Sequence, residues 1–354
     1  MKILGIETSC DETAAAVISA TPGKIEVLSN IVSSQIKLHA KWGGVVPHLA
    51  AREHAKNIDW VMAAALKTSK TKLNDIDLIA VTSGPGLIVS LVIGTTFAKA
   101  LSWKTGIPIA GTNHMEGHVS SNWLSKIPPD KKLFPSLCLI VSGGHTELVL
   151  MQDHGKYKMI GQTLDDAAGE AFDKIARILN LSYPGGPIIS KYAEKGNSEV
   201  FKLPRPMIKT KNYDFSFSGL KTAVLYLVRD LTSKNNLPAG KAGKLTLQQK
   251  RNIAASAQDA IVEVLVSKTM RAAQEYKVRS VMLSGGVSAS QLLRKRLVTA
   301  GKTHKIQVII PELKYTTDNA AMIAVAGYFN WLKLKNKKPA DWRAVNPDPN
   351  WEIV

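Results

Sequence analysis

The chain has 354 residues, 45% of them hydrophobic, so it can bury the cores of two ordinary domains and is not disordered. Its 46 Lys and Arg against 28 Asp and Glu give a net charge of +18, which favours a polyanionic partner, although a merely basic soluble protein has the same composition. Cys10 and Cys138 are too few for a secreted disulfide framework or a zinc knuckle. No apolar run approaches the roughly 18 residues of a membrane span, and acidic residues interrupt any signal peptide, so we expect a cytoplasmic protein without membrane contact.

Apolar periodicity predicts two similar units, each starting with a strand meander. The first unit has predicted strands at 1–7, 13–19, 24–32 and 76–82, and helices at 49–67 and 87–103. The second has predicted strands at 135–141, 146–151, 280–283 and 306–310, and helices from Ser290 and at 318–334. Residues 233–244 have the composition of a mobile surface loop, and the tail from 333 that of an extended segment. This repetition predicts a duplicated α/β fold with a cleft between two lobes.

The chain has several glycine turns, most of them after predicted strands, where backbone N–H groups approach a phosphate closely. They are SGPG at 83–86, SGGH at 142–145, YPGGP at 183–187 and SGGVS at 284–288, the last including Gly285 and Gly286. A single such turn is usually only a tight turn, but four together predict a nucleotide site. No turn fits the P-loop or the Rossmann fingerprint.

A metal site is predicted by the segment HMEGH at 114–118. On a helix, His114 and His118 lie one turn apart on one face and can share a cation, although two surface histidines have the same spacing. Asp318, at the start of a later helix, is a candidate third ligand or an N-cap. Two His and one carboxylate suit Fe(II) or Zn(II). Met115 stands where a zinc protease of the HExxH type needs Glu, which excludes that class.

Acidic residues also cluster in DDAAGEAFDK at 165–174. At helical spacing, Asp166, Glu170 and Asp173 form one stripe beside an apolar one. A solvated helix face is the plain interpretation. Binding of ligand hydroxyls or transfer of a proton is the functional one, with Asp166 and Glu170 as candidate catalytic groups.

With these motifs assembled, the chain resembles the TsaD family, also known as glycoprotease-like proteins. The motifs occur in family order from residue 1 to about residue 330. They are GIETSCDET (5–13), GGVVP (43–47), SGPG (83–86), HMEGH (114–118), SGGHTE (142–147), DDAAGEAFDK (165–174), YPGGP (183–187), DFSFSGLKT (214–222) and TDNAA (317–321).

The resemblance implies an actin/Hsp70/sugar-kinase fold, with 1–112 and 319–354 in the first lobe and 113–318 in the second. It implies transfer of threonylcarbamoyl from threonylcarbamoyl-adenylate to the exocyclic amine of adenosine 37, in tRNAs that read codons starting with A. One divalent metal, with Fe(II) preferred over Zn(II), would be held by His114, His118 and Asp318. Bacterial members of the family work with the partner proteins TsaB and TsaE, whereas mitochondrial members act as homodimers. The short termini of this chain favour the bacterial type.

The same resemblance implies the residues that bind the donor. The adenylate's phosphate and acyl group would lie against the segment from 140 to 144, and its sugar and base against residues further along. These substrate-binding residues are Ile140, Val141, Ser142, Gly143, Gly144, Asp173, Gly186, Ser190 and Ser290. The nucleotide loops would contribute Ser9, Asp11, Gly285 and Gly286.

Three positions depart from the family pattern. Ser290 stands where the family has Asn, Ser190 where it has Asp, and Thr316 or Thr317 where a Cys is frequent. Serine reaches less far and carries no charge, so we expect weaker adenosine contacts or a bridging water.

Two other functions fit the same fold. A sugar or acetate kinase would use ATP and Mg²⁺ and would not need the histidine pair. A non-catalytic nucleotide-binding scaffold would give no adenylate-dependent product on tRNA.

Overall fold

The computed structural model describes residues 1–124, 130–233, 243–334 and 341–353, and within them the chain forms two lobes, each built on a five-stranded sheet. The strand orders are β3-β2-β1-β4-β5 and β8-β7-β6-β9-β10, so the two sheets have the same topology. The first strand of each sheet pairs antiparallel with the second and parallel with the fourth. The predicted duplication of an α/β unit is confirmed.

The predicted strands of the meanders are present, with small shifts at their ends. Strands β5 and β8 were not predicted; β5 is short and β8 alternates only weakly. The first sheet contains β1 (Lys2–Glu7), β2 (Glu12–Thr21), β3 (Lys24–Ser34), β4 (Leu78–Gly84) and β5 (Ile109–Asn113). The second contains β6 (Ser136–Val141), β7 (Thr146–Asp153), β8 (Lys156–Gln162), β9 (Ser280–Ser284) and β10 (Gln307–Ile309).

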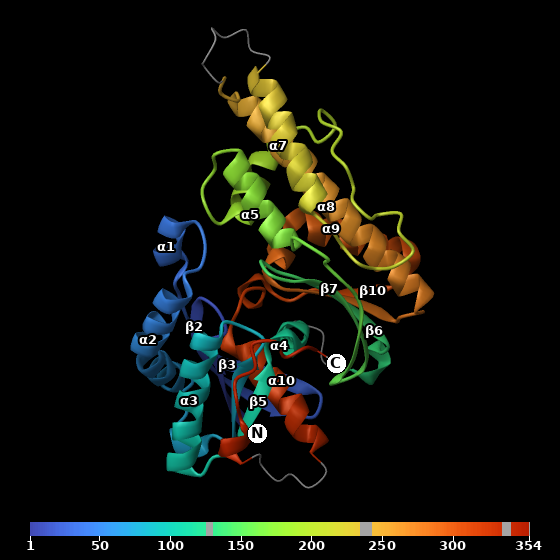
Figure 1. Ribbon diagram of the computed structural model, residues 1–354. Coiled ribbons are helices and arrows are strands. Elements are labelled where there is room, and N and C mark those ends of the chain that lie inside the picture. Colours follow the sequence, from blue (N-terminus) through green and yellow to red (C-terminus); the bar gives the residue numbers. More distant parts are fainter. Residues whose placement is uncertain (125–129, 234–242, 335–340, 354) are drawn as a thin grey trace.

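Helices cover both faces of each sheet, as Figure 1 shows. In the first lobe these are α2 (Pro47–Thr68) and α3 (Ile88–Thr105), and the short α1 (Ile36–His39) lies beyond the start of α2. Between the sheets lie α4 (His114–Ser120) and α10 (Ala320–Lys333). The second lobe carries α5 (Ala168–Ile178), α6 (Gly185–Ala193), α7 (Ser218–Ser233), α8 (Leu247–Glu275) and α9 (Gln291–His304). Short 3₁₀ turns are η1 (Ala40–Trp42), η2 (Leu73–Asp75), η3 (Ser121–Leu124), η4 (Lys131–Leu133), η5 (Gly286–Ala289), η6 (Leu313–Tyr315) and η7 (Trp342–Ala344).

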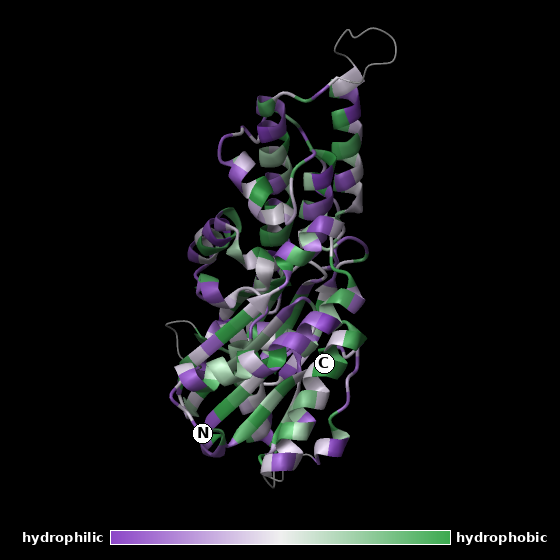
Figure 2. Ribbon diagram, turned by 90° about the vertical axis from the view of Figure 1, so that its left-hand side faces the viewer, coloured by the Kyte–Doolittle hydropathy of each residue, from purple (hydrophilic) through white to green (hydrophobic). Residues whose placement is uncertain are grey.

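Alternating side chains of each strand enter different core layers. On β6, Leu139 and Val141 face α5 and α8, whereas Cys138 and Ile140 face the layer of α4 and α10. This period of two is the expected consequence of a pleated strand buried on both faces. Figure 2 shows the strands as predominantly hydrophobic and the outer helices as mixed. The layer between the sheets therefore joins the two lobes and carries the ends of α4 and α10, where the metal ligands were predicted.

The C-terminal segment returns to this layer. The Asp348 N–H donates to Ser83 O, and Ile353 is buried in this layer, whereas Val345 is buried in the core beneath α2 and α3. The predicted mobile loop at 233–244 lies almost entirely outside the described residues. No helix within the described ranges is long and apolar enough to span a bilayer. The division of the chain between the lobes stays a prediction.

Candidate functional site

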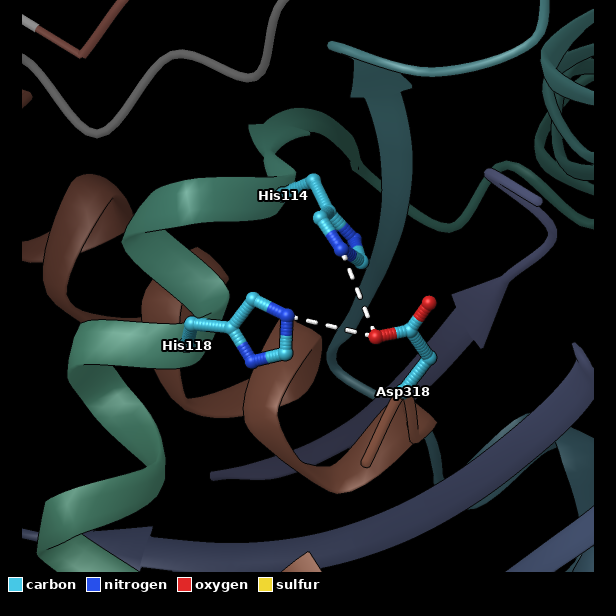
Figure 3. A group of neighbouring side chains, drawn as sticks. All are labelled: His114, His118 and Asp318. Atoms are coloured by element: carbon cyan, nitrogen blue, oxygen red, sulfur yellow. Dashed lines mark ion pairs between the residues drawn. The ribbon is translucent and has the colours of Figure 1, made fainter. Parts of the chain in front are cut away.

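The two histidines of the HMEGH segment and Asp318 meet between the lobes. His114 and His118 lie on α4, and their Nε2 atoms are 3.5 and 3.2 Å from Asp318 Oδ1 (Figure 3). One ligand atom from each of the three residues lies within 4.8 Å of the others. His114 and His118 are buried, whereas the Asp318 side chain is 21% exposed. This grouping of two imidazoles and a carboxylate fits a divalent transition metal.

A buried carboxylate on the first strand orients one of these ligands. Glu7 ends β1, and its Oε2 lies 3.0 Å from His114 Nδ1. Because a carboxylate only accepts hydrogen bonds, this contact places a proton on Nδ1 and directs Nε2 to the cation position. Thr82 Oγ1 donates to the same Oε2 (2.6 Å), and Ser9 Oγ lies 3.2 Å from His114 Nδ1.

The charges of the group are strongly coupled. Burial opposes a charged His114, but the carboxylates of Asp318 and Glu7 outweigh it and raise its pKa well above the usual value. Burial likewise opposes a charged Asp318, but His114 and His118 hold its pKa well below the usual range. A cation bound at the Nε2 atoms would replace the proton that Asp318 attracts there, whereas the Nδ1 proton of His114 would stay with Glu7.

The alternative role of Asp318 as a helix cap is wrong. Helix α10 is capped by Asn319, whose side chain accepts from the Met322 N–H at 3.1 Å. Asn319 Nδ2 also donates to Thr317 O (2.8 Å), which fixes the turn before the helix. Asp318 is thereby left outside the helix, with its carboxylate directed at α4.

A second site lies within the second lobe, in a cavity of about 620 Å³ between α5, α6, α8 and the start of α9. Gly143 of the turn after β6 and Gly286 of the turn after β9 lie on its wall. The polar and charged lining includes Gln258, Asp259 and Arg296. Five of the nine residues predicted to bind substrate line it, and they come from four separate elements: Gly143, Asp173, Gly186, Ser190 and Ser290.

Ser190 and Ser290, the two serines that differ from the family pattern, have hydroxyls that already form hydrogen bonds within the protein. Ser190 Oγ accepts from Gln258 Nε2 at 2.9 Å, and Ser290 Oγ caps α9 by accepting from the Leu293 N–H at 3.5 Å. Asp173 Oδ1 accepts from the Gly185 N–H at 2.6 Å, which joins α5 to α6. Burial raises the pKa of Asp173, and this hydrogen bond opposes the change.

The remaining predicted residues of the glycine turns have different surroundings. The side chains of Ile140 and Val141 are fully buried on opposite faces of β6, so only their backbone is available to a ligand. Ser142 Oγ accepts from the His145 N–H at 3.1 Å and closes the turn, and Gly144 is exposed. A Cβ on Gly169 would lie 2.4 Å from Ser142 O, so the turn packs directly on α5.

The four residues predicted for nucleotide loops do not form one group. Gly286 lines the cavity, and Gly285 has φ +85, a conformation that favours glycine, beside Val141 O. Ser9 instead lies at His114, in the first lobe. The Asp11 carbonyl accepts from the Gln35 N–H, and its side chain is not part of the cavity wall.

The acidic stripe predicted on α5 is wrong. The Thr146 hydroxyl accepts from the Ala168 N–H at 2.8 Å and the helix starts there, so Asp166 precedes it. Lys174 Nζ lies 2.6 Å from Asp166 and 2.8 Å from Glu170, whereas Asp173 faces the cavity. Asp166 and Glu170 therefore lie at Lys174, and Asp173 lies apart from them at the cavity.

The motif DFSFSGLKT holds the segment before α5. The carboxylate of Asp165 accepts from the hydroxyls of Ser216 and Ser218 and from the Phe217 N–H. Burial opposes the charged form of Asp165, but these hydrogen bonds lower its pKa. The buried Lys268 donates to Asp214 O (2.6 Å) and so fixes the other side of the motif.

A smaller cavity of about 360 Å³ lies between the second sheet and the C-terminal segment. It is lined by His145 and Glu147 and, from the tail, Trp351 and Glu352. Burial and then the charge of Glu352 raise the pKa of Glu147 to about 7. Burial and the neighbouring His114 and His118 lower the pKa of His145 to about 4.

Sequence reasoning did not identify Glu7, Gln258 or Glu147 as site residues. For Glu7 the signal was available, since a carboxylate ends an otherwise apolar buried strand. Gln258 lies in the middle of the long helix α8, where nothing in the local pattern separates it from core neighbours.

Comparison with known proteins agrees with this geometry. The family model described as TsaD, tRNA N6-adenosine threonylcarbamoyltransferase, matches residues 26–325. A relative of that description from Thermosipho africanus is 48% identical over 353 residues, covering 100% of both chains. Another, from Bacillus subtilis, is 48% identical over 328 residues and covers 92% of this chain and 90% of the relative.

Two solved structures share the fold at low identity. HypF from T. kodakarensis superposes with a TM-score of 0.60 at 14% identity, over 95% of this chain and 48% of HypF. Component A of (R)-2-hydroxyglutaryl-CoA dehydratase from Acidaminococcus fermentans has a TM-score of 0.50 at 15% identity, over 94% of this chain and 100% of that one. They confirm the predicted actin-like fold class.

Proposed function

Because this chain belongs to the tRNA N6-adenosine threonylcarbamoyltransferase (TsaD) family and is a tRNA-modifying transferase, we propose threonylcarbamoyl-adenylate as its donor. The acceptor is the exocyclic amine of adenosine 37 in tRNAs that read codons starting with A. The family assignment selects this class over the kinase and scaffold interpretations. The reaction takes place in the cytoplasm, with partners of the TsaB and TsaE type.

The observation that carries this proposal is the position of the SGGH turn. Its Gly143 lines the large cavity, and its His145 lines the smaller cavity together with Met115, the residue next to His114. An adenylate whose adenosine occupies the cavity would thus have its phosphate at this turn, next to the triad. Backbone N–H groups of the glycines are suited to hold that phosphate.

The triad fits a resident metal, which we propose is Fe(II), with Zn(II) as the alternative. Held by His114, His118 and Asp318, it would supply a Lewis acid for the phosphate of the leaving AMP. The protein's own contribution is orientation of donor and acceptor, and backbone donors at the glycine turn.

A carboxylate must accept the proton that the amine loses. Asp166 is mostly buried between Lys174 and Lys221, whereas the side chain of Glu170 is 44% exposed. Of the two predicted catalytic groups, Glu170 is therefore the one we assign to this proton, with Asp166 positioning Lys174.

Reconstitution tests the proposed function. The chain is combined with tRNA, threonine, bicarbonate, ATP, an adenylate-forming enzyme and TsaB-like and TsaE-like partners, and the nucleosides are analysed. We expect N6-threonylcarbamoyladenosine at position 37, and none when the tRNA carries guanosine there. Equal product without this chain would overturn the proposal.

A further inference from the structure

The end of the first lobe nearest α5 exposes a large aromatic side chain. Trp42 ends the 3₁₀ turn after α1 and is 68% exposed. The segment around it is held by its own hydrogen bonds, since His39 lies 3.0 Å from Gln35 Oε1 and accepts from the Val46 N–H at 3.3 Å. Trp42 thus projects from an ordered segment, although burying an indole is favourable.

The surroundings of Trp42 carry positive charge. No Asp or Glu occurs between Glu26 and Glu53, whereas Lys37 and Lys41 are in this stretch and exposed. Across from them, the exposed Arg177 of α5 donates from Nη2 to Gly43 O at 2.9 Å. We call Lys37, Lys41, Trp42 and Arg177 the tip surface. An exposed aromatic side chain among exposed cations is the pattern of sites that bind single-stranded nucleic acid.

This surface lies beside the proposed donor cavity. Arg177 is one helical turn from Asp173, which lines the cavity, and its charge acts on the Asp173 carboxylate. Figure 1 shows α1 and the following turn next to α5. A nucleic-acid loop whose target base reached the donor would therefore have neighbouring nucleotides within range of Trp42.

We propose that the tip surface binds unpaired nucleotides that flank the acceptor adenosine in the tRNA anticodon loop. Trp42 stacks on one base, and Lys37, Lys41 and Arg177 contact adjacent phosphates. Stacking needs no base-specific hydrogen bond, so this contact suits a family of tRNAs with different loop sequences. The inference rests on the proposed function, because it assumes tRNA as the acceptor.

Paired tryptophan variants test it. Trp42→Ala is compared with Trp42→Phe and with Trp103→Ala, since Trp103 is 69% exposed but near the far end of α3, whose first residues lie at the Ser9 turn. Binding of a fluorescent anticodon stem-loop RNA and the KM for tRNA are measured. We expect Trp42→Ala to lower the affinity for the RNA and to raise the KM for tRNA, each by about 5- to 150-fold, as loss of one stacked base does. Trp42→Phe keeps most affinity and Trp103→Ala all of it.

Separate readouts identify a failure. Calorimetric binding of a nonhydrolysable adenylate to the folded variants should be unchanged, which excludes general damage. Wild-type affinity in Trp42→Ala, or an equal loss in Trp103→Ala, would overturn the inference. So would a Trp42→Ala variant that binds RNA normally but no longer binds a TsaB-like partner, because the surface would then be a protein interface. Absence of transfer by the wild-type chain would instead overturn the proposed function.

Discussion

The turn between β1 and β2 in the first lobe and the turn between β6 and β7 in the second occupy the same place in the same topology, but they carry different chemistry. The first brings Glu7 and Ser9 to His114. The second, SGGH, lines the large cavity with Gly143 and has no acidic residue. The duplicated fold therefore supplies two equivalent strand ends, of which one orients a histidine of the triad and the other borders the large cavity.

The comparison predicts that a substitution at the site beside one turn leaves the ligand of the site beside the other turn bound. The largest effect is expected for His118→Ala, which removes a ligand from the triad. Bound metal and transfer activity should fall by more than the roughly 10–100-fold typical of supporting contacts, whereas binding of adenosine in the cavity of the second lobe should persist. Elemental analysis and nucleoside analysis measure the two losses. His48→Ala, at an exposed position of α2, is the matched control; equal metal in both variants would contradict the assignment.

A smaller loss is expected for Glu7→Gln. The variant keeps an acceptor for His114 Nδ1 but loses the charge that favours its proton, so metal affinity should fall by about 10–100-fold. Competition with a chelator measures the affinity, and circular dichroism confirms the fold. Glu26→Gln, exposed on β3, should bind metal like the wild type. Unchanged affinity in Glu7→Gln would mean that the carboxylate supports the fold alone.

Restoring the family residues in the large cavity, which the second turn borders, tests its role in adenylate binding. Ser190→Asp with Ser290→Asn should tighten binding of a nonhydrolysable adenylate by about 3- to 100-fold, because longer polar side chains reach further into the cavity. Asn also caps helices well, so α9 should keep its start. Calorimetry measures affinity, with Ser182→Asp outside the cavity lining as control. Weaker or unchanged binding would contradict the expectation that the two serines are weaker substitutes for the family residues.

The smallest effect concerns stability at the end of the second turn. The pKa of Glu147 is raised from about 4.5 to about 7, facing Glu352 and His145, so its contribution to folding is complete at low pH and is lost as pH rises through 7. Glu147→Gln cannot ionise and should be more stable than wild type by about 1–3 kcal/mol at pH 8, with no such gain near pH 4. Denaturant unfolding at both pH values measures this. Glu199→Gln, exposed, should show no pH-dependent difference; a gain of equal size there would contradict the cause.

Local pattern was sufficient for much of this protein. Alternating apolar residues determined the meanders, the i and i+4 spacing put His114 and His118 on one face of α4, and glycines marked the turns after β6 and β9. These features depend on neighbours within a few residues, which the sequence displays directly. The resemblance to a family then connected them to a reaction.

Only the packed molecule decided which of these features meet. Asp318 reaches α4 because Asn319 rather than Asp318 caps α10, and Glu7 reaches His114 across more than 100 residues of chain because β1 lies next to β4 and β5 follows. The prediction of an acidic stripe was wrong because α5 starts at Ala168, whose N–H donates to the Thr146 hydroxyl of β7, so Asp166 lies outside the helix. The Glu7–His114 and Thr146–Ala168 contacts join segments that are far apart in the chain, so no local pattern displays them, and each provides a buried polar group with the partner it needs.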